Sequence, residues 1–184
     1  RDAGEASSVP SRVCSGPGLI LAGSASAATR GQIAAAGRLP QRALDAHQLV
    51  AGQAVSDVVT WIRDVWARDS EATVLIHSGV PAAGVDATSG EGRAHAAALE
   101  RAFADIATDL APDVRRLIVA GGETSGAVIK ALGIVDLQMG PAIGPGTAWS
   151  FGTPNGQAEP IAIALKSGNF GGPDFFLSAE QELK

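Results

Sequence analysis

The sequence predicts an α/β protein, a three-layer α/β/α sandwich around a mixed, mostly parallel sheet. Three short apolar runs, GLILAG, TVLIHSG and RLIVAGG, begin at Gly18, Thr73 and Arg116. Continuous runs of this kind are typical of strands that are covered on both faces. Segments with helical periodicity lie between them, and strands that alternate with helices favour a parallel sheet. The composition agrees, since the chain is rich in Ala and Gly and contains no Tyr.

The first half of the chain supplies two of the strands and two helices. We expect the first strand at residues 18–23, followed by a Ser- and Ala-rich helix at residues 27–36 that Gly37 ends. Residues 53–68 carry apolar side chains at i, i+3, i+4 and i+7, which predicts a helix with one apolar face. The second strand follows at residues 73–79.

The second half continues this alternation and then departs from it. Residues 91–110 predict an amphipathic helix, and the third strand is followed by a helix that begins near Thr124 and stops at Gly133. Short apolar stretches and Gly/Pro turns within residues 136–152 indicate that part of the sheet is antiparallel. The last expected elements are a strand at residues 161–165 and a closing helix at residues 173–183.

Length, charge and cysteine content narrow the protein class. The 184 residues suit a tail or linker at residues 1–16 and one domain at residues 17–184. A net charge of −5 without any Lys/Arg cluster argues against a nucleic-acid surface. No run approaches the roughly 18 apolar residues that cross a membrane, so no membrane partner is expected. Cys14 is the only cysteine, which excludes an intrachain disulfide and favours a reducing, cytoplasmic location.

Three loops share one design, in which small residues follow a strand and precede a helix or turn. They are LAGSASAATR, VAGGETSGAV and LKSGNFGG. Ligands of α/β sheets bind beyond the carboxyl ends of the strands. Glycines allow close approach of the backbone, and free N–H groups at a helix start attract anions. Each loop alone is also ordinary turn chemistry. Their repetition predicts a site for a small anionic ligand, most simply the phosphate chain of a nucleotide.

The common nucleotide and hydrolase motifs do not fit these loops. Gly121 and Gly126 are spaced as in a P-loop, but Ala127 and Val128 stand where Lys and Ser or Thr should follow. No GxGxxG follows a strand, and neither GxSxG nor a Cys–His pair supports a nucleophilic hydrolase. The three His residues are not at metal-ligand spacing.

Four stretches in this order, LAGSASAATRGQI, IVAGGETSGAVIKALG, MGPAIGPGTAW and ALKSGNFGGPDFF, resemble the C-terminal nucleotide-binding domain of the four-carbon acid sugar kinase family. The resemblance covers residues 18–180. The family includes 3-oxo-tetronate, threonate and erythronate kinases, so it implies an ATP-dependent phosphotransferase of carbohydrate metabolism that uses Mg²⁺. In the family an N-terminal domain carries the sugar-acid site, and phosphoryl transfer takes place in the cleft between the two domains.

That N-terminal domain has no counterpart in this chain. The partners and the activity expected of the chain are therefore those of the C-terminal domain alone. The resemblance implies that ATP or ADP binds here, whereas the four-carbon sugar acid binds through the absent domain. The general base should also come from that domain, so the isolated chain should be inactive as a kinase. A second copy of the chain, in a homodimer, is a further candidate partner.

Individual residues can be assigned to the predicted ATP site, each beside a purely structural alternative. Ser24 and Ser26 lie where the resemblance places ATP contacts, although Ser26 could instead cap the following helix. Glu123 could hold Mg²⁺ or the ribose hydroxyls, or merely stabilise the helix start. Lys166 should emerge at the ligand edge and pair with phosphate, unless it is an ordinary surface lysine. The complete predicted ATP-binding set is Ser24, Ser26, Gly121, Gly122, Glu123, Thr124, Ser125, Gly126, Lys166, Gly168 and Asn169.

Two other functions are compatible with the sequence. The chain could be a non-catalytic nucleotide- or phosphate-binding module. It could also be an unrelated α/β domain whose glycine loops bind another anion, such as a sugar phosphate.

Overall fold

The fold is built on one seven-stranded sheet with the strand order β2-β3-β1-β4-β7-β6-β5. The computed structural model describes residues 15–79 and 86–183. The first five strands in this order are parallel, and β6 and β5 continue the sheet antiparallel. The strands are β1 (Gly18–Ala22), β2 (Gln41–Leu44), β3 (Thr73–Ser78), β4 (Arg116–Ala120), β5 (Gln138–Gly144), β6 (Thr147–Gly152) and β7 (Ile161–Lys166).

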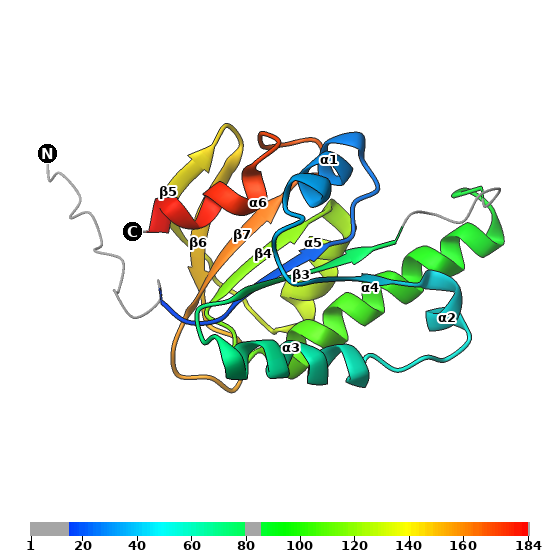
Figure 1. Cartoon of the computed structure of the whole chain (residues 1–184), viewed down its shortest axis with the longest axis horizontal. Coiled ribbons are helices and arrows are strands. Elements are labelled where there is room, and N and C mark those ends of the chain that lie inside the picture. Colours follow the sequence, from blue (N-terminus) through cyan, green and yellow to red (C-terminus); the bar gives the residue numbers. More distant parts are fainter. Residues whose placement is uncertain (1–14, 80–85, 184) are drawn as a thin grey trace, which may run out of the picture.

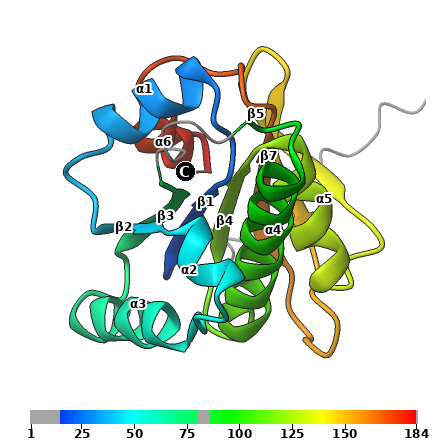
Figure 2. The same ribbon diagram turned by 90° about the vertical axis from the view of Figure 1, so that its right-hand side faces the viewer.

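Helices cover both faces of the sheet, as Figures 1 and 2 show. Helices α1 and α6 lie on one face, and α3, α4 and α5 lie on the other. This arrangement confirms the predicted α/β/α sandwich with a mixed, mostly parallel sheet. The helices are α1 (Ala27–Ala35), α2 (Ala46–Val50), α3 (Ser56–Arg68), α4 (Gly90–Leu110), α5 (Gly122–Ala131) and α6 (Phe175–Ser178), followed by a 3-10 helix at Ala179–Leu183.

The continuous apolar strands are buried because each face of the sheet has its own core. All five residues of β1 and all five of β4 are buried. Side chains of β1 alternate, so that Leu19 and Leu21 pack under α3 and α4 while Ile20 packs under α1 and α6. The two cores each contain a buried Trp, which is Trp66 of α3 on one face and Trp149 of β6 on the other.

Several element boundaries differ from the sequence expectations. The sequence did not predict β2 or α2, because QRAL contains no apolar run and α2 has only five residues. Helix α5 begins at Gly122 and not at Thr124. The closing helix is a single α-helical turn that continues as a 3-10 helix. Most of the expected tail, including Cys14, lies outside the described residues. Along the described ranges no helix is both long and apolar enough to cross a bilayer.

The amino-terminal edge of the sheet is held by a buried arginine. The side chain of Arg116, at the start of β4, is only 6% exposed. Its Nε lies 3.2 Å from Oε1 of Glu180, and its Nη2 donates to the backbone oxygen of Glu71 over 3.0 Å. Glu180 also accepts a hydrogen bond from Thr73 at the start of β3. The guanidinium of Arg116 and the carboxylate of Glu180 together therefore join the starts of β3 and β4 to the C-terminal 3-10 helix.

We expect Arg116→Met to lower the free energy of unfolding by about 2 kcal/mol, because it leaves a partly buried carboxylate without its cation. Urea denaturation followed by circular dichroism would measure this loss. Arg63→Met is the matched control, since Arg63 and its partner Asp113 are 51% and 43% exposed. Its loss should stay below about 1 kcal/mol. Equal losses in the two variants would show that the Arg116 cluster contributes no more than a surface ion pair.

Candidate functional site

The three glycine-containing loops meet at the carboxyl-terminal edge of the sheet. Strands β1, β4 and β7 are neighbours, and their last residues Ala22, Ala120 and Lys166 are partners in register. The loops are also joined through their backbones, since the N–H of Gly23 donates to the oxygen of Ala120 over 2.9 Å and that of Gly121 to the oxygen of Lys166 over 2.9 Å. The predicted convergence of these loops is thus a property of the fold.

In the loop after β1, two serine side chains organise the start of α1. Ser26 is the N-cap residue, and its Oγ accepts from the N–H of Thr29 over 3.1 Å. The structural alternative for Ser26 is therefore present, and the residue makes a second contact by donating to the carbonyl of Gly168 over 2.6 Å. The Oγ of Ser24 accepts from the N–H of Ser26 over 3.2 Å and remains half-buried beside the other two loops.

In the loop after β4, helix α5 begins without a cap. Gly121 has a φ of +126°, a conformation that side chains rarely adopt, and no side chain hydrogen-bonds to the helix start. The first N–H of the helix with a backbone partner is that of Ser125, which donates to Gly121. The N–H groups of Gly122, Glu123 and Thr124 are thus directed out of the helix start, as in any helix. This makes a positively polarised, open helix terminus at the centre of the three loops.

Two details of the start of α5 concern the predicted site residues. The glycine with the positive φ is Gly121, whereas Gly122 is an ordinary helical residue. Thr124 does not cap the helix but is 4% exposed and packs toward Gly23, where a Cβ would lie 2.0 Å from its Oγ1. Gly122 and Glu123 are exposed, and a Cβ at Gly122 would meet no atom within 4 Å. Ser125 and Gly126 follow in the same helix, half-buried and exposed respectively.

The loop after β7 lies directly against the first loop. A Cβ at Gly168 would come within 2.3 Å of the Oγ of Ser24, so only glycine fits this position without displacement. Asn169 is exposed at the tip. Sequence reasoning missed two residues of α1 that hold this loop. Thr29 donates to the carbonyl of Gly168 over 2.9 Å, and Nε2 of Gln32 donates to the carbonyl of Gly172 over 2.9 Å. The available signal was the polar i, i+3, i+6 series of Ser26, Thr29 and Gln32 in an Ala-rich helix.

Lys166 does not emerge at the ligand edge, and that expectation is wrong. Its side chain is 1% exposed, and its Nζ donates to the backbone oxygens of Ser167 and Gly168 over 3.0 and 3.1 Å. The surface-lysine alternative fails for the same reason. Burial lowers the pKa of the Lys166 ammonium below its ordinary value, because the charged form loses its hydration.

The described residues do not form a metal cage on their own. Among residues 15–79 and 86–183, no three His, Cys, Asp or Glu side chains are close enough to share an ion. Glu123, in the first turn of α5, is the carboxylate at the open helix terminus. One carboxylate suits Mg²⁺ only when phosphate oxygens and water complete its coordination, which is the usual mode for nucleotide-bound Mg²⁺.

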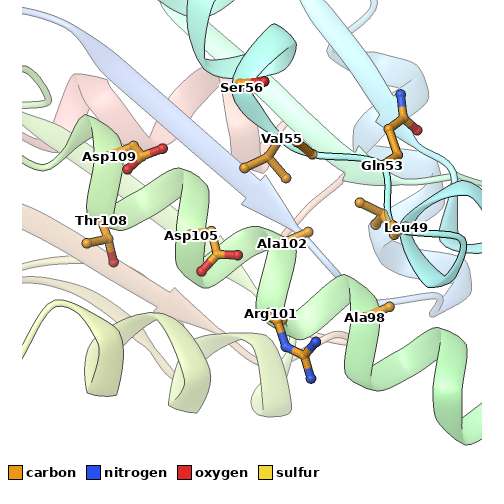
Figure 3. A pocket seen from close by; sticks show the side chains of 12 residues that line it. Leu49, Gln53, Val55, Ser56, Ala98, Arg101, Ala102, Asp105, Thr108 and Asp109 are labelled. Carbon is orange, nitrogen blue, oxygen red and sulfur yellow. The ribbon is translucent and has the colours of Figure 1, made fainter.

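A separate groove of about 540 Å³ lies between α4 and the segment that joins α2 to α3. Figure 3 labels Arg101, Asp105 and Asp109 of α4 among the lining residues, together with Leu49 of α2 and with Gln53 and Val55 of that segment. None of its lining residues belongs to the three loops. The groove is therefore distinct from the candidate site.

Comparisons with known proteins cover nearly the whole chain. Residues 19–176 match the model of the family described as "Nucleotide-binding C-terminal domain". The chain is 43% identical over 186 residues to the 3-oxo-tetronate kinase of Cupriavidus necator, a match that covers 98% of this chain and 41% of that enzyme. The chain thus spans about two fifths of the length of the curated relatives that it matches.

Solved structures show the same fold. A protein of Haemophilus influenzae aligns with a TM-score of 0.78 and 30% identity, covering 92% of this chain and 40% of that one. A Bordetella bronchiseptica protein, crystallised with citrate as a domain-swapped dimer, aligns with a TM-score of 0.69 and 24% identity over 91% of this chain and 41% of that one. The second likeness supports the fold alone.

The buried ammonium of Lys166 gives a pH-dependent expectation for stability. Its folded-state pKa lies below the 10.5 of an ordinary lysine, so the unfolded chain binds more protons in the window between the two values. The stability of the wild type relative to Lys166→Met should therefore rise as the pH increases through this window toward 10.5. Urea denaturation of both proteins at several pH values would measure the difference. A difference that is independent of pH would contradict a depressed pKa.

Proposed function

Because this chain belongs to the nucleotide-binding C-terminal domain family of the 3-oxo-tetronate kinases, we propose that it holds ATP at the edge formed by the loops after β1, β4 and β7. The observation that carries this proposal is the uncapped start of α5, which follows β4 and lies between the other two loops. Three N–H groups directed out of a helix terminus are suited to phosphate oxygens. Ser24, Ser26, Gly168 and Asn169 would line the same nucleotide from the flanking loops.

Glu123 fits a role beside the phosphates only if a cation is present. Its carboxylate is exposed in the first turn of α5, next to the proposed phosphate position. The Glu123 carboxylate and a neighbouring phosphate would repel each other. Mg²⁺ held between them would offset this repulsion and favour nucleotide binding. When bound, Mg²⁺ would supply charge neutralisation for the transferred phosphoryl group.

We propose phosphoryl transfer from ATP to a hydroxyl of a four-carbon sugar acid of the 3-oxo-tetronate type as the reaction in which this domain takes part. Such a transfer depends mainly on positioning and on electrostatic stabilisation of the phosphoryl oxygens. The α5 terminus would provide the fixed N–H donors for that purpose. The acceptor site and the general base would belong to the part of the kinase that this chain does not match, since the match covers 41% of the Cupriavidus enzyme.

A non-catalytic nucleotide- or phosphate-binding module remains the second candidate. A module of this kind would use the same three-loop edge, and it agrees with the finding that the chain matches only part of the length of the kinases. The two candidates differ in whether the chain, combined with the rest of such a kinase, supports turnover of a sugar acid.

Calorimetric titration with ATP and ADP, in the presence and absence of Mg²⁺, tests the proposed function. We expect binding of both nucleotides and weaker binding without Mg²⁺, while inorganic phosphate and sugar phosphates should bind far less. We also expect no turnover of threonate or erythronate by residues 1–184 alone, because lost positioning can cost about 7–11 kcal/mol of barrier lowering. Absence of heat and of a thermal shift with either nucleotide at millimolar concentration would reject the proposal.

Replacing Gly122 tests the position of the phosphates. Gly122→Val should fold normally, because a Cβ there meets no atom within 4 Å of the protein. It would, however, place a branched side chain beside the first N–H groups of α5, and we expect ADP affinity to fall at least tenfold, or by about 1.4 kcal/mol.

Gly31→Val is the matched control for this substitution. Gly31 is also an exposed helical glycine with open space around its Cβ position, but it lies in α1 outside the three loops. The control should bind ADP like the wild type. If folded Gly122→Val does so as well, the start of α5 is only a turn and not a phosphate site.

A further inference from the structure

The ammonium of Lys166 is buried where β7 ends, and all its donors are used inside the protein. An ammonium has three N–H donors. Its Nζ contacts three oxygens, which are Oγ1 of Thr29 at 3.3 Å and the backbone oxygens of Ser167 at 3.0 Å and Gly168 at 3.1 Å. Within residues 15–79 and 86–183 no carboxylate forms an ion pair with it. A direct hydrogen bond from Lys166 to a phosphate would therefore break one of these three bonds.

The carbonyl of Gly168 is the point at which this network converges. It accepts from Lys166 and also from the hydroxyls of Ser26 over 2.6 Å and Thr29 over 2.9 Å. The donors come from the end of β7, the N-cap of α1 and the first turn of α1. Three donors from two separate elements fix the direction of one peptide unit.

Fixed carbonyls also fix the N–H groups of the same peptide units. In a planar trans peptide, the C=O and the N–H of the next residue point in opposite directions. The carbonyls of Ser167 and Gly168 are both directed at the buried ammonium, so the N–H groups of Gly168 and Asn169 are directed away from it. Neither N–H donates to a backbone acceptor within the described chain. The loop thus offers two adjacent donors, a geometry suited to an anion.

The same orientation continues along the loop through Gln32. Its Nε2 lies 3.0, 3.1 and 2.9 Å from the carbonyl oxygens of Phe170, Gly171 and Gly172, so that three acceptors share its two N–H donors. Carbonyl oxygens, which would repel phosphate, are therefore gathered toward α1 along most of the loop. The side chain of Gln32 is 1% exposed, so this contact is internal to the protein.

We propose that Lys166 is a positioning residue for the nucleotide: its ammonium, with the hydroxyls of Ser26 and Thr29, holds the Gly168 carbonyl inward and thereby presents the N–H groups of Gly168 and Asn169 to the phosphate chain. This inference rests on the proposed function, because it takes the ligand to be ATP or ADP. In this role Lys166 does not bind phosphate directly. Its positive charge attracts the phosphate chain from the inner side of the loop, without contact.

A double-mutant cycle with Lys166→Met and Thr29→Val separates positioning from direct contact. Both substitutions remove donors to the same network, so each should weaken ADP binding about tenfold, and the double variant should lose much less than the product of the two losses. Adenosine, which lacks phosphates, should bind all variants equally. Lys130→Met is the control, because it removes the same charge from an exposed lysine in the last turn of α5.

The nucleotide-free protein provides a second readout. In ¹H–¹⁵N spectra, Lys166→Met should shift the amide resonances of Gly168 and Asn169, and ADP should shift the same two resonances in the wild type. Losses that multiply fully in the double variant would show that Lys166 and Thr29 act independently and would overturn the inference. Unchanged ADP affinity in folded Lys166→Met would also overturn the inference, but it would leave the proposed function intact. Failure of the wild type to bind ADP would reject the proposed function itself and this inference with it.

If Lys166→Met does not fold, as judged by circular dichroism, the same carbonyl can be tested with Thr29→Val and with Lys166→Gln, which retains N–H donors. Thr29→Val should weaken ADP but not adenosine, and Lys166→Gln should bind ADP more weakly than the wild type. Wild-type ADP affinity in both variants would overturn the inference.

Discussion

The parallel register of β1, β4 and β7 is the constraint on which the candidate site depends. Ala22, Ala120 and Lys166 are partners across adjacent strands, so the three chain segments leave the sheet at the same level. Parallel strands must be joined by crossovers through helices, and this brings the start of a helix to the same edge of the sheet. Loops that follow residues 22, 120 and 166 of the chain thus become neighbours without any long-range motif to join them.

Small residues allow these loops to approach as closely as they do. A side chain at Gly23 would collide with Thr124, and one at Gly168 would collide with Ser24. Each glycine therefore serves a contact with a different loop and not only its own turn. Gly121 is needed for another reason, its φ of +126°. What looks in the sequence like a series of flexible turns is in the structure a tightly packed junction with defined hydrogen bonds.

The sequence was sufficient to predict the elements whose residue pattern is determined by burial. It was insufficient to predict the direction of individual side chains and backbone groups. Continuous apolar runs identified β1, β3, β4 and β7, because strands covered on both faces admit little polarity. They could not identify β2, whose QRAL sequence is half exposed. The position of Lys166 at the end of β7 was readable, but whether its side chain points outward or inward depends on Thr29, which is 137 residues away. Likewise, the distinction between Gly121 and Gly122 depends on one backbone angle that adjacent glycines do not reveal.

The two buried indoles have a consequence for spectroscopy. With no Tyr in the chain, near-ultraviolet emission arises from three Trp residues. Trp66 belongs to the core under α3, whereas Trp149 belongs to the opposite core and donates from Nε1 to the carbonyl of Ala179 over 2.8 Å. Neither they nor Trp61 lies in the three loops, so quenching by a nucleotide bound at that edge would not occur by contact. A change in emission on adding nucleotide would instead report a rearrangement transmitted through the sheet to one of its faces.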